Sequence, residues 1–276
     1  MAELTREFVE HEYNNRALVP EHPAFFARWE KDSAYVRGTL DCECDIPYGP
    51  DPRHRIDLFA AQARRGTLLF IHGGYWRSLD KSMFSWLAAP YVAAGIGVAL
   101  PNYRLAPAVS IEDIVEDAIA ATNWLMLNGV KHRMVTERVA ISGHSAGGHL
   151  TAALFATPWS RLTFDPARIA GGVPISAIVD FDPIRLFSFN SDFRLDEAAV
   201  GRLNLEARPP TIAAPLVVAV GGAESSEFIR QSRLLAQAWR KQVKALQILP
   251  GYNHFSVVDA FAERGQPLHE ATLGLF

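Results

Sequence analysis

Cysteine is scarce in this sequence, which has only Cys42 and Cys44 among its 276 residues. Their i, i+2 spacing on an expected strand points both side chains to one face, with poor geometry for a bridge between them. A disulfide framework is therefore excluded, and both cysteines are expected to be free thiols. The surrounding cluster, residues 42–45, lacks a second Cys or His pair at zinc-site spacing, so we expect no metal site.

Long hydrophobic runs are absent as well. No apolar stretch reaches about 18 residues without polar interruption, so no membrane-spanning helix and no membrane partner is expected. The N-terminal residues 1–13 mix charged with apolar side chains. They lack the basic region and the unbroken apolar region of a signal peptide. We therefore expect a soluble, cytoplasmic protein.

The sequence also lacks a strong charge of either sign. Its formal net charge is −3, and no run of Lys or Arg interleaved with aromatic residues suggests a groove for nucleic acid. Nucleic acid is thus not an expected partner, whereas a small-molecule substrate is. The sequence does not fix the oligomeric state, and a homodimer is one of the open alternatives.

What the sequence does contain is an alternation of short β-branched or apolar runs with longer helical ones, beginning near residue 54. This pattern predicts an α/β fold with a mostly parallel sheet and helices on both faces. With 49% hydrophobic residues, one domain spanning residues 1–276 is the default. The expected strands are His54–Ala60, Thr67–Ile71, Ile96–Pro101, Arg138–Ser142, Ile169–Ile175, Pro215–Val220 and Ala245–Leu249.

The clearest expected helix spans Ser110 to Asn128. Apolar side chains recur there at 3.6-residue spacing, Ser110 can cap the start, and Gly129 is expected to end the helix. Further helices are expected over the first 35 residues, over Asp80–Ala94, where Pro90 should bend or break the helix, and over Glu227–Gln242.

Residues 177–210 break the alternation. They lie between two expected strands, carry many aromatic and Asp residues, and close on two prolines. Ligands of open α/β sheets bind at the carboxyl ends of the strands, so an insertion here is a candidate cap or lid over the binding pocket.

The strongest chemical signal is Gly143-His144-Ser145-Ala146-Gly147, which matches G-x-S-x-G between an expected strand and an expected helix. In that context the serine lies on a tight, strained turn with its hydroxyl exposed, and flanking glycines avoid side-chain clashes. Ser145 is therefore the predicted nucleophile. The alternative is a plain glycine-rich turn.

A second signal, His72-Gly73-Gly74-Tyr75-Trp76, follows the expected strand Thr67–Ile71. Two consecutive glycines allow the main chain to approach a carbonyl and donate N–H groups to an oxyanion. The Ala146 N–H supplies the complementary donor after the nucleophile. A glycine turn without catalytic meaning is the alternative. His72 itself is expected to orient the loop, and residues 101–107 are expected to support it.

The serine needs a base, and in the order serine, acid, histidine this base follows the last strand. His254 fits that position, within Gly251-Tyr252-Asn253-His254-Phe255, whereas His269 and His11 lie outside the expected topology. For the acid, Glu224 and Glu227 compete. Glu224 is preferred because it lies in the loop, while Glu227 falls in the first turn of a helix, where acidic residues commonly offset the macrodipole.

Several side chains are candidates for the pocket wall. Arg185 or Arg194 could pair with a substrate carboxylate, with a solvated surface position as the alternative for each. Aromatic side chains in such numbers more often belong to the core, which is the alternative for the aromatic candidates. The residues expected to line the pocket are Tyr75, Trp76, His144, Trp159, Phe181, Phe187 and Phe189.

With these residues in place, the chain resembles the α/β-hydrolase-type kynurenine formamidases, also called arylformamidases. It is more loosely similar to the hormone-sensitive-lipase-type esterases. HGG and G-x-S-x-G alone are shared by many esterases, but the Tyr75-Trp76 extension and the EFIRQS continuation point to the formamidase branch. The motifs that carry the resemblance are HGGYW at 72–76, NYRLAP at 102–107, GHSAGGHL at 143–150, VGGAESSEFIRQS at 220–232 and NHF at 253–255.

This resemblance implies an α/β-hydrolase fold and acyl transfer without a cofactor, converting N-formylkynurenine to kynurenine and formate in tryptophan catabolism. The alternative enzyme is a carboxylesterase or amidase acting on small acyl esters, carbamates or anilides. Animal members have Asp at the acid position, whereas this sequence has Glu224. This difference from the family affects the expected substrate more than the expected reaction type. A non-catalytic binding protein of this fold is disfavoured by the intact site. The implied nucleophile, acid and base are Ser145, Glu224 and His254, and the implied oxyanion donors are Gly73, Gly74 and Ala146.

Overall fold

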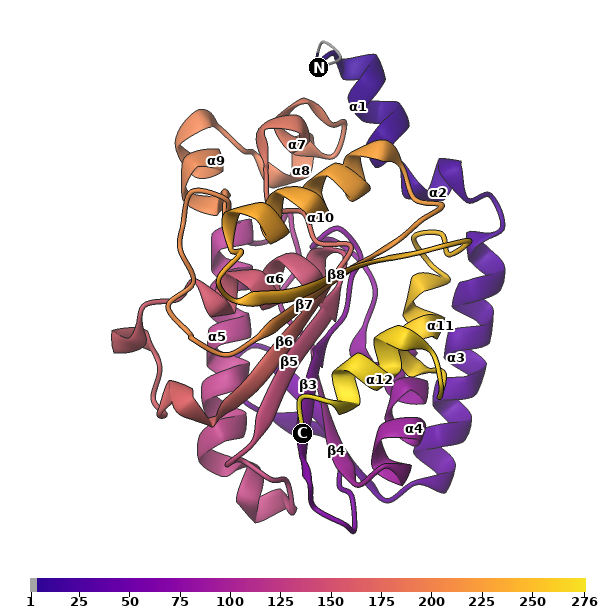
Figure 1. Cartoon of the computed structure of the whole chain (residues 1–276), viewed down its shortest axis with the longest axis vertical. Coiled ribbons are helices and arrows are strands. Elements are labelled where there is room, and N and C mark those ends of the chain that lie inside the picture. Colours follow the sequence, from indigo (N-terminus) through magenta and orange to yellow (C-terminus); the bar gives the residue numbers. More distant parts are fainter. Residues whose placement is uncertain (1–3) are drawn as a thin grey trace.

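The computed structural model describes residues 4–276, and its centre is an eight-stranded sheet with helices on both faces (Figure 1). The strand order is β1-β2-β4-β3-β5-β6-β7-β8. Strands β3 to β8 are parallel to one another, whereas β1 and β2 form an antiparallel edge, with β2 paired to β4. The strands are Cys42–Pro47 (β1), Arg55–Phe59 (β2), Gly66–Ile71 (β3), Ile96–Pro101 (β4), Val139–His144 (β5), Ile169–Ile175 (β6), Leu216–Gly221 (β7) and Val243–Leu249 (β8).

The expected α/β class and all seven expected strands are confirmed, each boundary falling within two residues of its prediction. The eighth strand, β1, contains the two cysteines. Their sulfur atoms lie 3.6 Å apart on one face, and both cysteines are free thiols. Helices cover both faces of the sheet, which explains why β3, β4, β5 and β7 are buried along their whole length.

Each face of the sheet has its own set of packed helices. One core cluster includes residues of α5 (Ile111–Asn128), α6 (Ala146–Phe155) and α10 (Ser226–Ala238). The other includes residues of α3 (His22–Thr39), α4 (Ala88–Ala93), α11 (Val257–Ala262) and α12 (Pro267–Leu273). In Figure 1 these two sets lie on opposite sides of the strands.

Helix α5 begins as its sequence predicts. The Ser110 side chain accepts a hydrogen bond from Asp113 N, and the Asp113 carboxylate accepts one from Ser110 N, which completes a capping box. Its end is less abrupt than expected. Gly129 keeps a right-handed conformation, and the chain continues as a 3₁₀ turn, η2 (Gly129–His132), until Arg133 takes the left-handed one with φ 62°.

Two other expected helices differ in detail. The segment 80–94 forms a 3₁₀ helix, η1 (Lys81–Leu87), followed by α4, so the break precedes Pro90 rather than coinciding with it. Pro90 lies in the first turn of α4, where its missing N–H costs no helical hydrogen bond. Helix α10 ends at Ala238, short of the expected Gln242, because the chain turns at Trp239 toward β8. Two further 3₁₀ turns are η3 (Trp159–Arg161) and η4 (Pro166–Arg168).

The N-terminal segment is helical, as expected, in α1 (Arg6–Tyr13), α2 (Asn15–Leu18) and α3. Residues 1–3 of the expected helical segment lie outside the described residues. Residues 177–210, here called the cap segment, carry α7 (Asp182–Leu186), α8 (Asn190–Phe193) and α9 (Glu197–Leu203). They follow the carboxyl end of β6 and lie at the same end of the molecule as α1 (Figure 1). Across residues 4–276, no helix is long and apolar enough to cross a bilayer.

Candidate active site

Ser145 occupies the turn between β5 and α6. Its backbone has φ 56° and ψ −117°, a strained conformation for a residue other than glycine. The two flanking glycines are required by close packing. A Cβ at Gly143 would lie 2.3 Å from the Gly147 oxygen, and one at Gly147 would lie 1.9 Å from the Ile71 oxygen. The G-x-S-x-G pattern therefore fits a turn with no space for side chains at either glycine.

The structure brings His254 and Glu224 to this serine. The Ser145 Oγ lies 3.1 Å from His254 Nε2, and His254 Nδ1 lies 2.6 Å from Glu224 Oε2. All three side chains follow carboxyl ends of parallel strands, namely β5, β7 and β8, which is why residues so distant in sequence meet. The Asn253 side chain holds the His254 turn by accepting hydrogen bonds from Phe255 N and Ser256 N, both at 2.9 Å.

The other carboxylate oxygen of Glu224 is fully engaged. Oε1 accepts a hydrogen bond of 2.7 Å from Gly221 N and one of 2.5 Å from the Ser176 hydroxyl. Two donors on one oxygen fix the orientation of the carboxylate. Glu227, the competing acid, faces Tyr13 and Arg230 instead, accepting 2.8 Å hydrogen bonds from both.

The two consecutive glycines Gly73 and Gly74, here called the diglycine corner, lie against Ser145. A Cβ placed on Gly73 would be 3.2 Å from the Ser145 Cβ, so the loop packs directly on that side chain. Gly74 has φ +113°, and a Cβ there would lie 2.3 Å from the Ser78 oxygen. In the part of the chain that the structure describes, the N–H groups of Gly73, Gly74 and Ala146 donate no hydrogen bond. These main-chain donors can therefore bind an incoming oxyanion.

His72 and the segment after β4 hold this corner in place. The buried His72 ring stacks on Tyr103 at 4.4 Å between centroids, and its Nδ1 lies 2.7 Å from the Gly73 oxygen. Burial lowers the pKa of His72 to about 4, so the ring is neutral near pH 7. Tyr103 donates hydrogen bonds to the main-chain oxygens of His72 and Gly73, and Ala106 N donates to the Trp76 oxygen. Residues 101–107 thus contact the loop they were expected to support.

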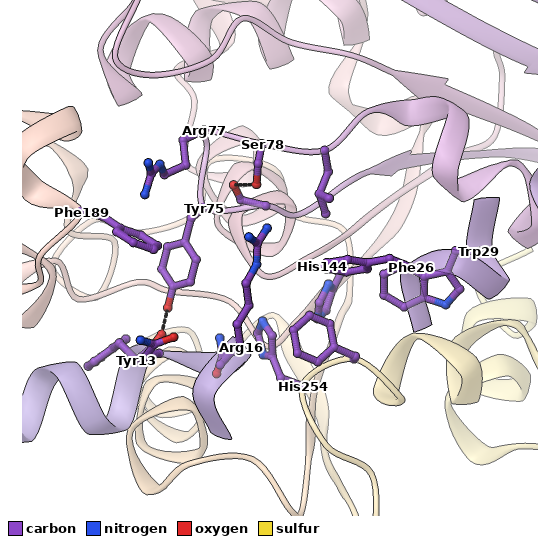
Figure 2. A pocket seen from close by; sticks show the side chains of 15 residues that line it. Tyr13, Arg16, Phe26, Trp29, Tyr75, Arg77, Ser78, His144, Phe189 and His254 are labelled. Atoms are coloured by element: carbon purple, nitrogen blue, oxygen red, sulfur yellow. Dashed lines mark hydrogen bonds between the residues drawn. The ribbon is translucent and has the colours of Figure 1, made fainter. Parts of the chain in front are cut away.

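A cavity of about 350 Å³ opens beside these groups (Figure 2). Of the expected wall residues, Tyr75, His144 and Phe189 line it. Trp76, Phe181 and Phe187 do not, which corrects their assignment to the pocket. They are buried in the core, where Trp76 packs against Phe181 with 5.3 Å between ring centroids. Positive φ values at both Tyr75 and Trp76 turn the chain sharply, so Tyr75 faces the cavity while Trp76 faces the core.

His144 lies beside His254. Its ring centroid is 4.7 Å from that of His254, and it is almost completely buried. Burial, and to a smaller extent the neighbouring His254, holds the pKa of His144 well below its usual value, so this imidazole stays neutral. Its Nε2 has no hydrogen-bond partner within residues 4–276.

Much of the cavity wall comes from the N-terminal segment, which the sequence analysis did not assign to the site. The aromatic content of that segment was its only signal. Arg185, Arg194 and Trp159, which were candidates for the wall, do not line the cavity. The N-terminal lining residues are Tyr13, Asn14, Asn15, Arg16, Phe26 and Trp29, and other unassigned lining residues are Arg77, Ser78, Leu79 and Phe255. Within residues 4–276, no three His, Cys, Asp or Glu side chains gather where they could hold a metal ion.

Comparisons with known proteins give matches in both sequence and fold. The sequence profile of the α/β-hydrolase fold family matches residues 68–206. The kynurenine formamidase of Salmo salar is 24% identical over 95% of this chain and 91% of its own length. That of Drosophila melanogaster is 25% identical over 79% of this chain and 76% of its own length. A crystal structure from Silicibacter sp. tm1040, described as a thioesterase candidate, is 30% identical. It superposes with a TM-score of 0.83 over 94% of this chain and 97% of its own.

Proposed function

Since the chain belongs to the α/β-hydrolase fold family, we propose that it is a serine hydrolase that releases formate from an aryl formamide, N-formylkynurenine foremost. The enzyme is a hydrolase, and its likeness to kynurenine formamidases extends over most of the chain. The observation that carries the serine mechanism is the continuous contact from Ser145 Oγ through His254 to Glu224 at 3.1 and 2.6 Å.

The first step is attack of the Ser145 oxygen on the formyl carbonyl. His254 Nε2 is within hydrogen-bond distance of that oxygen and takes its proton as the bond forms. Glu224 accepts the hydrogen bond from Nδ1, which orients the ring and stabilises the imidazolium. Negative charge on the carbonyl oxygen is received by the N–H groups of the diglycine corner and Ala146.

Collapse of the tetrahedral intermediate then breaks the carbon–nitrogen bond. The proton held by His254 passes to the leaving arylamine, whose nitrogen is easier to expel than an alkyl amine because its charge delocalises into the ring. A formyl-serine remains. Water, deprotonated by the same imidazole, attacks this ester, and formate and free Ser145 are the products.

Residues 177–210 form part of the same proposal, as a cap within a single domain that spans the chain. Phe189 of the cap segment lines the cavity. Its ring lies 5.5 Å from that of Tyr75 in the loop of residues 72–76, here called the oxyanion loop. A substrate in the cavity would therefore contact the cap and the loop together.

Ester hydrolysis is the second candidate, because the same acyl transfer serves esters. The 30% identical structure described as a thioesterase candidate covers as much of the chain as the formamidases do, which favours including oxygen and sulfur esters in any test.

The decisive experiment compares turnover of N-formylkynurenine with that of 4-nitrophenyl acetate, 4-nitrophenyl butyrate and an acyl thioester. Formate release with a kcat/KM at least equal to that of the esters is expected. If esters are cleaved while the formamide is untouched at millimolar concentration, the enzyme is an esterase.

The serine mechanism is tested separately. Ser145→Ala should lower kcat by at least roughly a thousandfold and abolish labelling by a fluorophosphonate probe. Ser191→Ala, which removes an exposed hydroxyl from the cap segment, is the matched control and should keep both. Labelling that persists in Ser145→Ala would mean that another residue is the nucleophile.

A further inference from the structure

The cavity beside Ser145 carries positive charge without any acidic side chain in its wall. Its lining includes Arg16 and Arg77 but no Asp and no Glu, although the chain as a whole is acidic. Most of the remaining lining is aromatic or otherwise apolar. A guanidinium at such a wall attracts an anion, because no carboxylate of the wall competes for it.

The two arginines are not equivalent. Arg77 already has a partner, since its Nη2 lies 2.8 Å from an oxygen of Asp192 and its guanidinium stacks 4.2 Å over the Phe189 ring. Arg16 has no carboxylate within 4 Å among residues 4–276, and its guanidinium lies 5.6 Å over the Phe26 ring. Arg16 is therefore the cavity cation whose hydrogen-bonding capacity is still open.

The backbone around Arg16 is held firmly. Arg16 lies in α2, and Asn14 caps that helix by accepting a hydrogen bond from Ala17 N. Tyr75 of the oxyanion loop donates a hydrogen bond to the Tyr13 oxygen just before α2. The adjacent Glu12 carboxylate accepts hydrogen bonds from the Ser226 hydroxyl at 2.6 Å and from the first turn of α10.

The side chain points inward from this anchored backbone. In Figure 2, Arg16 extends from its ribbon into the cavity that Tyr75 and His144 also line. His254 lines the same cavity. The guanidinium therefore faces the space where a substrate bound to the catalytic groups would extend.

We propose that Arg16 binds a carboxylate that the substrate carries away from its scissile bond, so that the enzyme selects aryl acyl compounds with an anionic side chain. This inference rests on the proposed function, because it places the reacting carbonyl at Ser145. A single guanidinium with two parallel N–H donors matches a carboxylate.

The test uses a ligand that is not hydrolysed. 4-Oxo-4-phenylbutanoate and its carboxamide differ only in the charge of the terminal group, and both are assayed as inhibitors of 4-nitrophenyl acetate hydrolysis. The wild-type enzyme is expected to bind the carboxylate about ten to a hundred times more tightly than the carboxamide, the range of a charge-assisted hydrogen bond. Arg16→Gln should reduce this ratio to about one, and Arg16→Lys should keep part of it.

Two further variants make the result specific. Arg6→Gln removes another exposed N-terminal arginine that does not line the cavity, and it should keep the full ratio. Arg77→Gln should also keep it, because Asp192 already occupies Arg77. Equal inhibition by carboxylate and carboxamide in the wild type, or a ratio that depends on Arg77 and not on Arg16, would overturn the proposal.

Failure of this inference and failure of the proposed function give different results. If N-formylkynurenine is not cleaved but the inhibition ratio still depends on Arg16, the carboxylate site stands and the formamidase assignment falls. If N-formylkynurenine is cleaved and Arg16→Gln leaves its KM unchanged, the formamidase assignment stands and the carboxylate site falls.

Discussion

The hydroxyl of Ser176 donates a 2.5 Å hydrogen bond to Oε1 of Glu224, on the side of the carboxylate that faces away from His254. Ser176 follows β6 directly, is fully buried and has a left-handed backbone with φ 49°. Its N–H donates to the Ala219 oxygen on β7, which fixes the residue between two strands. An otherwise unfavourable conformation thus places a hydroxyl against Glu224, and in the proposed mechanism Ser176 is a positioning residue.

Removing that hydroxyl should slow the reaction without weakening substrate binding. Ser176→Ala leaves Oε1 with only Gly221 N, so we expect kcat to fall about three- to tenfold and KM to change less than twofold. Ser176→Gly loses the same hydroxyl but relaxes the left-handed backbone, so it should be more stable than Ser176→Ala by roughly 1 kcal/mol. Steady-state kinetics and thermal unfolding of both variants are the measurements. Recovery of kcat in Ser176→Gly would show that backbone strain, rather than the hydrogen bond, had caused the loss.

Gly74 is predicted to tolerate no side chain. An added Cβ would collide with the Ser78 oxygen at 2.3 Å, so the corner must move and its N–H groups leave the oxyanion position. We expect Gly74→Ala to lower kcat about a hundredfold, the cost typical of one lost oxyanion donor. Gly265→Ala is the control, because Gly265 also has a positive φ, 85°, but no neighbouring atom within 4 Å. Both variants should lose stability in denaturant titrations because of the positive φ, Gly74→Ala more than Gly265→Ala because of the added collision, and only Gly74→Ala should lose activity.

The hydrogen bond from Tyr75 to the Tyr13 oxygen is predicted to matter for substrate binding. Without it, α2 and its cavity residues are held less firmly to the oxyanion loop. Tyr75→Phe should raise KM about three- to tenfold and change kcat less than twofold. Tyr91→Phe loses a comparable buried bond, from Tyr91 to the Phe261 oxygen at 2.6 Å, on the opposite face of the sheet. It should cost similar stability, about 1 kcal/mol, with KM unchanged. An equal KM in both variants would contradict the anchoring role.

His149 is predicted to limit stability in acid. Its ring is fully buried between Trp76 and Phe181, and neither ring nitrogen has a partner within the described residues. Burial lowers the pKa of His149 from 6.5 to about 3. Between pH 6.5 and pH 3 the unfolded chain binds a proton that the folded protein does not, so stability falls as the pH falls through this window.

His149→Leu removes this dependence while filling a similar volume. At pH 7.5 the free energy of unfolding should differ from wild type by less than about 1 kcal/mol. At pH 5 the variant should be more stable than wild type by about 2 kcal/mol, the cost of leaving His149 unprotonated at that pH. Urea titrations at the two pH values measure the free energies of unfolding of both proteins. A difference between variant and wild type that is no larger at pH 5 than at pH 7.5 would refute the prediction.

The fold could be predicted from the sequence because the patterns that indicate its strands and helices are local. Each strand of the parallel sheet is a short apolar run of its own, and the capping box of α5 needs only Ser110 and Asp113. Ser145, Glu224 and His254 could be predicted to meet because each follows a strand, and all parallel strands end at one edge. Here topology supplies the long-range information that side-chain patterns alone lack.

The cavity wall was less predictable because it depends on docking between distant segments. Arg16 reaches the site only because Glu12 and Tyr13 contact α10, more than 200 residues later in the chain. No periodicity in the N-terminal segment encodes that contact. Similarly, Tyr75 and Trp76 are neighbours with similar composition, and only the backbone conformation decides that one faces the cavity and the other the core.

Helix α2 also bears on how this enzyme could be altered. It is a four-residue turn at the surface, and it contributes to the substrate cavity without supplying any strand of the sheet or any group that handles the reacting atoms. A combinatorial library restricted to positions 14–18 would therefore vary substrate range while the acyl-transfer groups keep their geometry. Selection for new substrates should begin there rather than at the residues around the nucleophile.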